Sequence, residues 1–141
     1  MIPTKEMMFV QFHLCNRKYF EGRLPFPRFE LLHSFRTCGC FRCDVEGGLF
    51  NKRLFNFSIS MTDCYDFTDA QFKDIFVHEM VHYYLAYYGI DKNAKHGRAF
   101  KKLAKSLNER YGLHITETLD LTQYKRREGT SKFGYWLAQL I

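Results

Sequence analysis

A histidine and glutamate motif carries the clearest chemistry in the sequence. It reads His78-Glu79-Met80-Val81-His82. Residues four apart lie on one face of a helix, so both imidazoles can point at one ion while Glu79 lies beside the open coordination position. Zinc suits this geometry, because it takes neutral imidazole nitrogens at about 2.0–2.1 Å and keeps a position for water in catalytic sites. The motif therefore predicts hydrolysis of a carbonyl compound, with Glu79 as the general base.

The alternative is a structural helix that simply buries two histidines and binds no metal. Placing Glu79 among so many apolar neighbours costs free energy unless a partner such as a metal centre compensates it. We therefore favour the metal site.

A third protein ligand is expected after the motif. Metzincins continue with Gly and His at the positions where this chain has Leu85 and Tyr88, which excludes that class. His96 follows a loop long enough to turn the chain back, and Glu109 is the competitor, as in thermolysin-like enzymes. At 1.5 Å per helical residue the two lie roughly 20 Å apart, so only one can reach the ion, and we favour His96.

Three helices are expected to position these residues. Apolar residues recur at helical spacing in three parts of the chain, which predicts helices over residues 4–20, 68–88 and 97–111. Thr68 is a good N-cap for the second helix and Gly89 a good terminator. This helix carries the motif and is apolar nearly all round, so it belongs in the middle of the domain. A polar loop over 91–95 precedes the third helix.

Short strands are expected between the first and second helices. Period-two alternation and runs of Phe, Leu, Ile and Cys predict strands over residues 29–34, 36–43 and 50–61, with a turn near Gly47 and Gly48. We expect an antiparallel meander. The fold class is thus α+β, with a small, mostly antiparallel sheet packed on the motif helix. The 141 residues (1–141) make a single domain, and the apolar stretch 133–141 indicates an edge strand or a chain that continues.

The charge of the chain is positive and unevenly distributed. Lys and Arg number 21 against 15 Asp and Glu, a formal net charge of +6, and basic segments flank an acidic middle that contains the motif. Basic residues on one face of the third helix, followed by a basic run, are Arg98, Lys101, Lys102, Lys105, Lys125, Arg126 and Arg127. Such faces can follow a nucleic-acid backbone through counterion release, or they are simply solvated.

The five cysteines indicate reduced thiols and a cytoplasmic protein, since their number is odd and no secretory leader precedes them. Cys38 and Cys40 share one face of a strand while Cys43 points to the other, so buried free thiols are favoured over a second metal site. The most apolar stretch, residues 76–90, is interrupted by polar residues and cannot span a membrane.

Two further groups on the motif helix are weighed as site residues. Its four tyrosines, at positions 83, 84, 87 and 88, are expected to pack, and none is singled out to stabilise an oxyanion. Asp74 lies one turn before His78 and would be a suitable acceptor for that imidazole, but an exposed carboxylate is the favoured interpretation.

The motif and its surroundings resemble the SprT-like family, which includes the Spartan DNA-repair proteases. The resemblance covers roughly residues 12–111 and rests on the segments 16–25 and 34–41, on His78-Glu79-Met80-Val81-His82-Tyr83-Tyr84-Leu85, and on His96-Gly97-Arg98-Ala99-Phe100. It implies a zincin-like minidomain in which His78, His82 and His96 hold one zinc ion and Glu79 is the catalytic base of peptide hydrolysis.

The resemblance also implies substrates among proteins on or near DNA. Many members carry a carboxy-terminal four-cysteine zinc ribbon, but no cysteine follows Cys64. Since only some members are established proteases, the alternative is a non-catalytic, zinc-stabilised module that binds nucleic acid.

Overall fold

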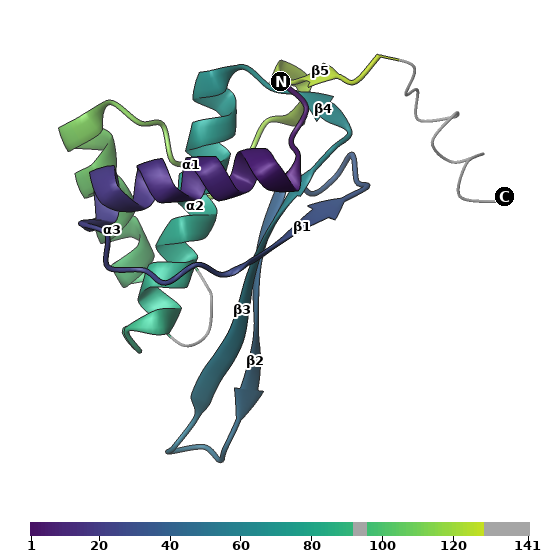
Figure 1. Cartoon of the computed structure of the whole chain (residues 1–141). Helices are drawn as coiled ribbons and strands as arrows, with labels where there is room; N and C mark the ends of the chain where they lie inside the picture. Colours follow the sequence, from purple (N-terminus) through teal and green to yellow (C-terminus); the bar gives the residue numbers. More distant parts are fainter. Residues whose placement is uncertain (92–95, 129–141) are drawn as a thin grey trace, which may run out of the picture.

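The chain folds as an α+β structure with helices on one side of a small sheet (Figure 1). The computed structural model describes residues 1–91 and 96–128. Its elements in chain order are α1 (Lys5–Phe20), β1 (Arg28–Leu32), β2 (Gly39–Glu46), β3 (Arg53–Thr62), β4 (Tyr65–Asp66), α2 (Asp69–Tyr87), α3 (Arg98–Tyr111), the short 3-10 helix η1 (Leu121–Gln123) and β5 (Lys125–Arg126). The strand expected over 133–141, and residues 92–95 of the expected loop, lie outside the described residues.

The three predicted helices are confirmed to within one residue at each end. For α2 the local reason is a capping box: the Gln71 N–H donates to Thr68 Oγ1 at 3.1 Å, and the Thr68 N–H donates to Gln71 Oε1 at 3.0 Å. Most of α2 is buried, and it contacts β2, β3 and α3. The motif helix therefore lies in the middle of the fold, as its apolar composition predicts.

The predicted antiparallel meander is wrong in one respect. The strand order is β1-β3-β2, with β1 parallel and β2 antiparallel to β3. Residues 33–38 pass around the end of β3, where the Asp63 N–H donates to the Leu32 carbonyl and the Thr62 N–H to the Cys38 carbonyl, both at 2.9 Å. This loop places β1 and β2 on opposite sides of β3, because the second half of β3 is buried and needs a partner along both edges.

Strand β2 is consequently an edge strand, and it forms a long hairpin with β3 that projects beyond the helices (Figure 1). The predicted turn is present: Gly47 has a φ of 94°, and the Gly48 N–H donates to Asn51 Oδ1 at 2.8 Å. The first part of β2, which begins at Gly39, contacts α2 at Ile75 and Glu79.

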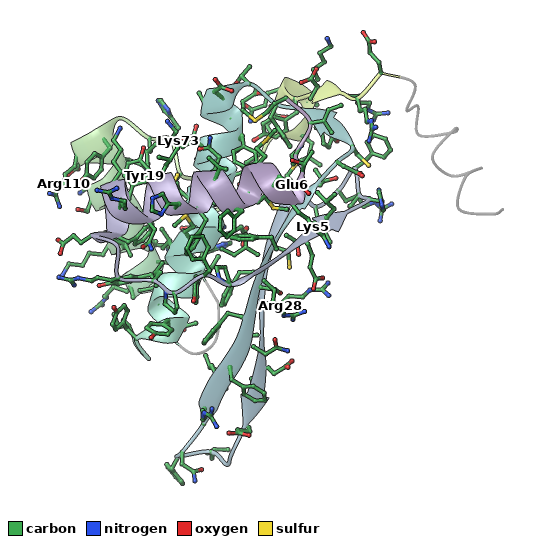
Figure 2. The ribbon with its side chains drawn as sticks, viewed as in Figure 1. Lys5, Glu6, Tyr19, Arg28, Lys73 and Arg110 are labelled. Atoms are coloured by element: carbon green, nitrogen blue, oxygen red, sulfur yellow. The ribbon has the colours of Figure 1, made fainter. Side chains whose placement is uncertain are left out.

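The core joins all three helices to β3. Met8 and Phe12 of α1, Ile59 of β3, and Phe76 and Met80 of α2 are completely buried. The far ends of α1 and α3 meet through the rings of Tyr19 and Tyr111, whose centroids lie 4.9 Å apart; Figure 2 labels Tyr19 and the neighbouring Arg110.

All five cysteines are free. Cys15, Cys38 and Cys64 are buried, and Cys40 and Cys43 are half-buried. Within residues 1–91 and 96–128, no helix is both long and apolar enough to cross a membrane.

Candidate metal centre

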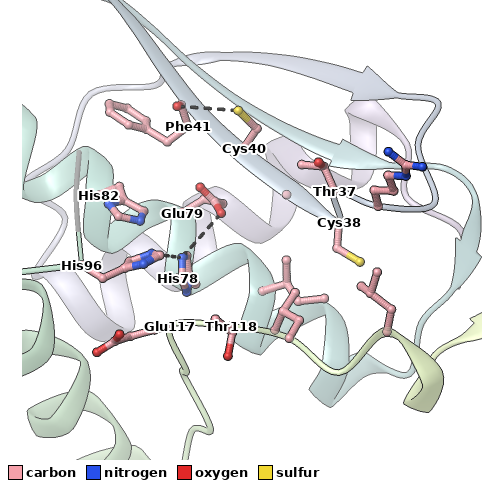
Figure 3. A pocket seen from close by; sticks show the side chains of 15 residues that line it. Thr37, Cys38, Cys40, Phe41, His78, Glu79, His82, His96, Glu117 and Thr118 are labelled. Atoms are coloured by element: carbon pink, nitrogen blue, oxygen red, sulfur yellow. Dashed lines mark hydrogen bonds and ion pairs between the residues drawn. The ribbon is translucent and has the colours of Figure 1, made fainter. Parts of the chain in front are cut away.

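Two histidines of one helix and a third from the loop before the next helix converge beside the sheet (Figure 3). His78 and His82 lie one turn apart on α2, and His96 lies just before α3. One ligand atom from each lies within 4.8 Å of the others, and no other such group of His, Cys, Asp or Glu occurs among the described residues. Glu109 lies elsewhere: it is exposed and faces Lys105 at 3.9 Å. The structure therefore brings His96, and not Glu109, to the motif.

Phe100 forms one side of this histidine cluster. Its ring centroid lies 4.9 Å from that of His78 and 4.7 Å from those of His82 and His96. Phe100 is almost completely buried in the first turn of α3. The apolar stripe of α3 thus positions the imidazoles as well as packing the helix, a role that the sequence pattern alone did not reveal.

The orientation of the His78 ring is determined by a backbone carbonyl. Nδ1 of His78 lies 2.8 Å from the Thr116 carbonyl oxygen. A carbonyl can only accept, so Nδ1 carries the proton and Nε2 keeps its lone pair. That Nε2 atom lies 3.1 Å from Nε2 of His96. The carbonyl therefore selects the tautomer that a metal requires.

The protonation of the cluster also suits a metal. Burial, together with the neighbouring His96, lowers the pKa of His78 to about 4. Burial likewise lowers the pKa of His82 to about 4. Both imidazoles are therefore neutral at pH 7, and neutral imidazole is the form that binds metal ions.

The donor set fits a zinc ion on geometric grounds as well. Two nitrogens bound at about 2.0–2.1 Å in a tetrahedral site lie roughly 3.3 Å apart, close to the 3.1 Å between the Nε2 atoms of His78 and His96. Nδ1 of His82 is buried and makes no hydrogen bond among the described residues. Neutral imidazoles are ligands that zinc and related metals accept.

Glu79 lies between the histidines and the start of β2. It is 7% exposed, and its Oε1 lies 3.8 Å from Nε2 of His78. Burial raises the pKa of Glu79 to about 8, and a backbone hydrogen bond from Phe41 lowers it. A cation at the histidine cluster would lower this pKa as well. A carboxyl group that titrates near neutrality is suited to taking up and releasing a proton.

Gly39 makes room for this carboxyl group. A Cβ atom at position 39 would lie 3.1 Å from Cγ of Glu79 and 3.0 Å from Cγ2 of Ile75. These distances are shorter than ordinary van der Waals contact, so β2 can approach the motif helix this closely only without a side chain. The Cys38-Gly39-Cys40 segment thus contributes to the site through its glycine.

The site opens into a cleft with a volume of about 440 Å³. One side is formed by the start of β2, and the other by residues 117–119 (Figure 3). Beyond Glu79 the cleft continues over three apolar side chains, those of Ile75, Leu119 and Leu121. The cleft therefore offers an apolar surface on the far side of Glu79 from the histidines.

The tyrosines of α2 pack elsewhere, and none lines the cleft. The Tyr83 hydroxyl donates to the Pro25 carbonyl at 2.7 Å, and the Tyr88 hydroxyl donates to that of Arg23 at 3.3 Å. The prediction that Asp74 is an exposed carboxylate is wrong: it is half-buried and accepts from the His114 N–H at 3.0 Å. It bonds to the segment after α3, and Thr116 contacts the His78 ring instead.

The basic residues predicted to bind nucleic acid lie in two places. Arg98, Lys101, Lys102 and Lys105 are exposed on α3, where Lys101 faces Glu117 at 3.5 Å. The basic run forms β5, a strand too short to be recognised in the sequence, which pairs with β4. There Arg126 lies over the Phe35 ring, 4.9 Å from its centroid, and Arg127 faces Asp63 at 3.9 Å.

The site thus combines two histidines and a buried glutamate of α2 with a third histidine that precedes α3. The sequence matches the model of the SprT-like family over residues 10–119, and the chain belongs to this family. The predicted resemblance is thereby confirmed, and membership indicates a metallopeptidase-type domain with zinc-related chemistry. No curated protein and no solved structure matches the chain.

Proposed function

We propose that the chain is a zinc metallopeptidase with a zincin-like site, in which His78, His82 and His96 hold one zinc ion and Glu79 is the general base. The observation that supports this best is the convergence of three imidazole ligand atoms within 4.8 Å, next to a buried carboxyl group. Family membership supports the same class of activity.

The residues of the site have distinct roles in peptide hydrolysis. When bound, the metal supplies Lewis acidity, which activates water and polarises a carbonyl at neutral pH. Glu79 accepts the proton of the attacking water and returns it to the leaving amine nitrogen. The Thr116 carbonyl holds the Nδ1 proton of His78, so Nε2 stays available as a ligand.

The cleft is suited to a peptide substrate. Strand β2 lines it and is an edge strand of the sheet, so an extended peptide can be added alongside it. The apolar end of the cleft, at Ile75, Leu119 and Leu121, would take an apolar side chain next to the cleaved bond. The exposed basic residues of α3 favour proteins bound to DNA as substrates.

Metal content and cleavage test this function directly. Purified protein is expected to contain one zinc ion per chain; His96→Ala should lose it, and the matched change Glu109→Ala should keep it. Glu79→Gln should keep zinc and lose cleavage of casein or of a DNA-bound protein. Zinc lost on Glu109→Ala and kept on His96→Ala would contradict the ligand assignment.

The competing function is a zinc-stabilised module that binds nucleic acid and cleaves nothing. The exposed basic residues on α3 support it. If Glu79→Gln keeps zinc and matches the wild-type protein in every cleavage assay, the peptidase proposal fails and the binding module is supported. Measurable cleavage that disappears in Glu79→Gln excludes the binding module as the sole function.

A further inference from the structure

The segment after α3, residues 113–119, has no regular secondary structure yet forms part of the metal centre. Its Thr116 carbonyl accepts the hydrogen bond from Nδ1 of His78 at 2.8 Å, and its last residues form one side of the cleft. A loop carbonyl can hold an imidazole in place only if the loop itself is held. The bonds that hold this segment are therefore part of the site.

Asn108 of α3 holds the residue next to Thr116 through both of its backbone groups. The Ile115 N–H donates to Asn108 Oδ1 at 2.8 Å, and Asn108 Nδ2 donates to the Ile115 carbonyl at 3.0 Å. Asp74 of α2 accepts from the His114 N–H at 3.0 Å, so two helices hold consecutive residues. An amide side chain suits this arrangement because its nitrogen donates while its oxygen accepts.

We propose that Asn108 is a positioning residue of the metal centre, acting through Ile115 and the Thr116 carbonyl on the tautomer and orientation of His78. The proposal rests on the metal centre of the proposed function. Ile115 is 5% exposed and its two bonds to Asn108 are partly buried, so removing the amide would leave peptide groups without a partner in a place that water reaches poorly. The segment would then shift to satisfy them, and the adjoining carbonyl would move away from Nδ1 of His78.

The chain contains a matched control in which the same pair of bonds serves another loop. Asn16 of α1 donates through Nδ2 to the Leu24 carbonyl at 2.8 Å and accepts from the Leu24 N–H at 3.2 Å. Both residues are buried, and neither lines the cleft. Asn16→Ala therefore reports the stability cost of losing such a pair without touching the histidines.

The experiment compares Asn108→Ala with Asn16→Ala in the full chain by two readouts. Competition with a chelator gives the zinc affinity, and ¹⁵N NMR of the metal-free protein gives the tautomer of the His78 ring. Both variants should melt at a lower temperature. Only Asn108→Ala should bind zinc at least about tenfold more weakly, the usual effect of losing an outer partner of a ligand, and lose the single Nδ1–H tautomer.

Equal zinc affinities in the two variants, or an unchanged His78 tautomer in Asn108→Ala, would overturn the proposal and leave Asn108 a purely stabilising residue. If Asn108→Ala does not fold, Asn108→Asp serves instead, because it keeps the shape and the acceptor but lacks the donor. If wild-type protein binds no zinc, the proposed function fails, and the NMR comparison alone decides the role of Asn108.

Discussion

At the scale of single residues, the site depends on a glycine at position 39, which has no side chain. Gly39 lets the start of β2 lie against the carboxyl group of Glu79, and Gly39→Ala would put a methyl group 3.1 Å from Cγ of Glu79. Overpacking of this kind costs about 1–3 kcal/mol and displaces the weaker neighbour. We expect Gly39→Ala to lower kcat for peptide cleavage while zinc content stays at the wild-type level.

The control is Gly97→Ala, because a Cβ at position 97 meets nothing within 4 Å. Peptide-cleavage assays on both variants at matched zinc content measure the difference in kcat. Equal kcat values for Gly39→Ala and wild type would show that Glu79 does not need its present position.

The titration of His78, His82 and Glu79 predicts how the stability of the metal-free protein depends on pH. Burial lowers the pKa of His78 and of His82 to about 4 in the folded protein, against about 6.5 in the unfolded chain. Between these values the unfolded chain binds protons that the folded protein does not, so the free energy of unfolding should rise with pH up to about 6.5. The pKa of Glu79 is raised to about 8 by burial. Between about 6.5 and 8 the folded protein holds a proton that the unfolded chain has lost, so stability should fall.

Chemical denaturation of the metal-free protein between pH 5 and 8.5 checks this expectation. The fall above about 6.5 amounts to at most about 2 kcal/mol, from 1.36 kcal/mol per pH unit. Glu79→Gln should abolish it. A fall that persists in Glu79→Gln would assign the titration to another group.

At the scale of elements, the motif helix and the position of His96 beside it could be predicted, but the sheet pairing could not. His78 and His82 follow from spacing within one helix, and His96 from a signature that continues across a loop. The partners of β3 depend on which way residues 33–38 turn, and alternation along a strand carries no information about its neighbour. The role of Thr116 could not be predicted either, because it contacts His78 through its backbone carbonyl, which every residue type has.

The packing of α3 against the histidines predicts that Phe100 contributes to zinc affinity as well as to the stability of the core. Phe100→Ala should cost about 3–5 kcal/mol of stability, as for other buried phenylalanines, and should weaken zinc binding because all three imidazoles lose a neighbouring ring. Phe72→Ala is the matched control, since Phe72 is equally buried but stacks on Phe76. Thermal unfolding and chelator competition, done below the melting temperature of both variants, separate the two effects. Zinc affinity that falls equally in both would assign the loss to general destabilisation.

At the scale of the whole molecule, the net charge is +6, and the contribution of particular basic residues to DNA binding can be tested. Arg98 and Lys102 are exposed on α3, whereas part of the basic run at β5 is engaged with Phe35 and Asp63. If α3 follows a DNA backbone, removing one basic side chain that neutralises a phosphate should reduce the slope of log K against log salt by about 0.9. The double change Arg98→Gln and Lys102→Gln should therefore reduce the slope by up to about 1.8, twice that amount.

A charge-matched control distinguishes a local interaction from the effect of net charge. Lys5 and Arg28 are exposed on α1 and β1, and both are labelled in Figure 2. Changing them to Gln lowers the net charge by the same two units without altering α3. Fluorescence anisotropy with a labelled duplex over a salt series measures both slopes. If both double variants weaken binding by the same amount, binding reflects net charge alone; if only the α3 variant loses affinity, α3 is the surface that contacts the duplex.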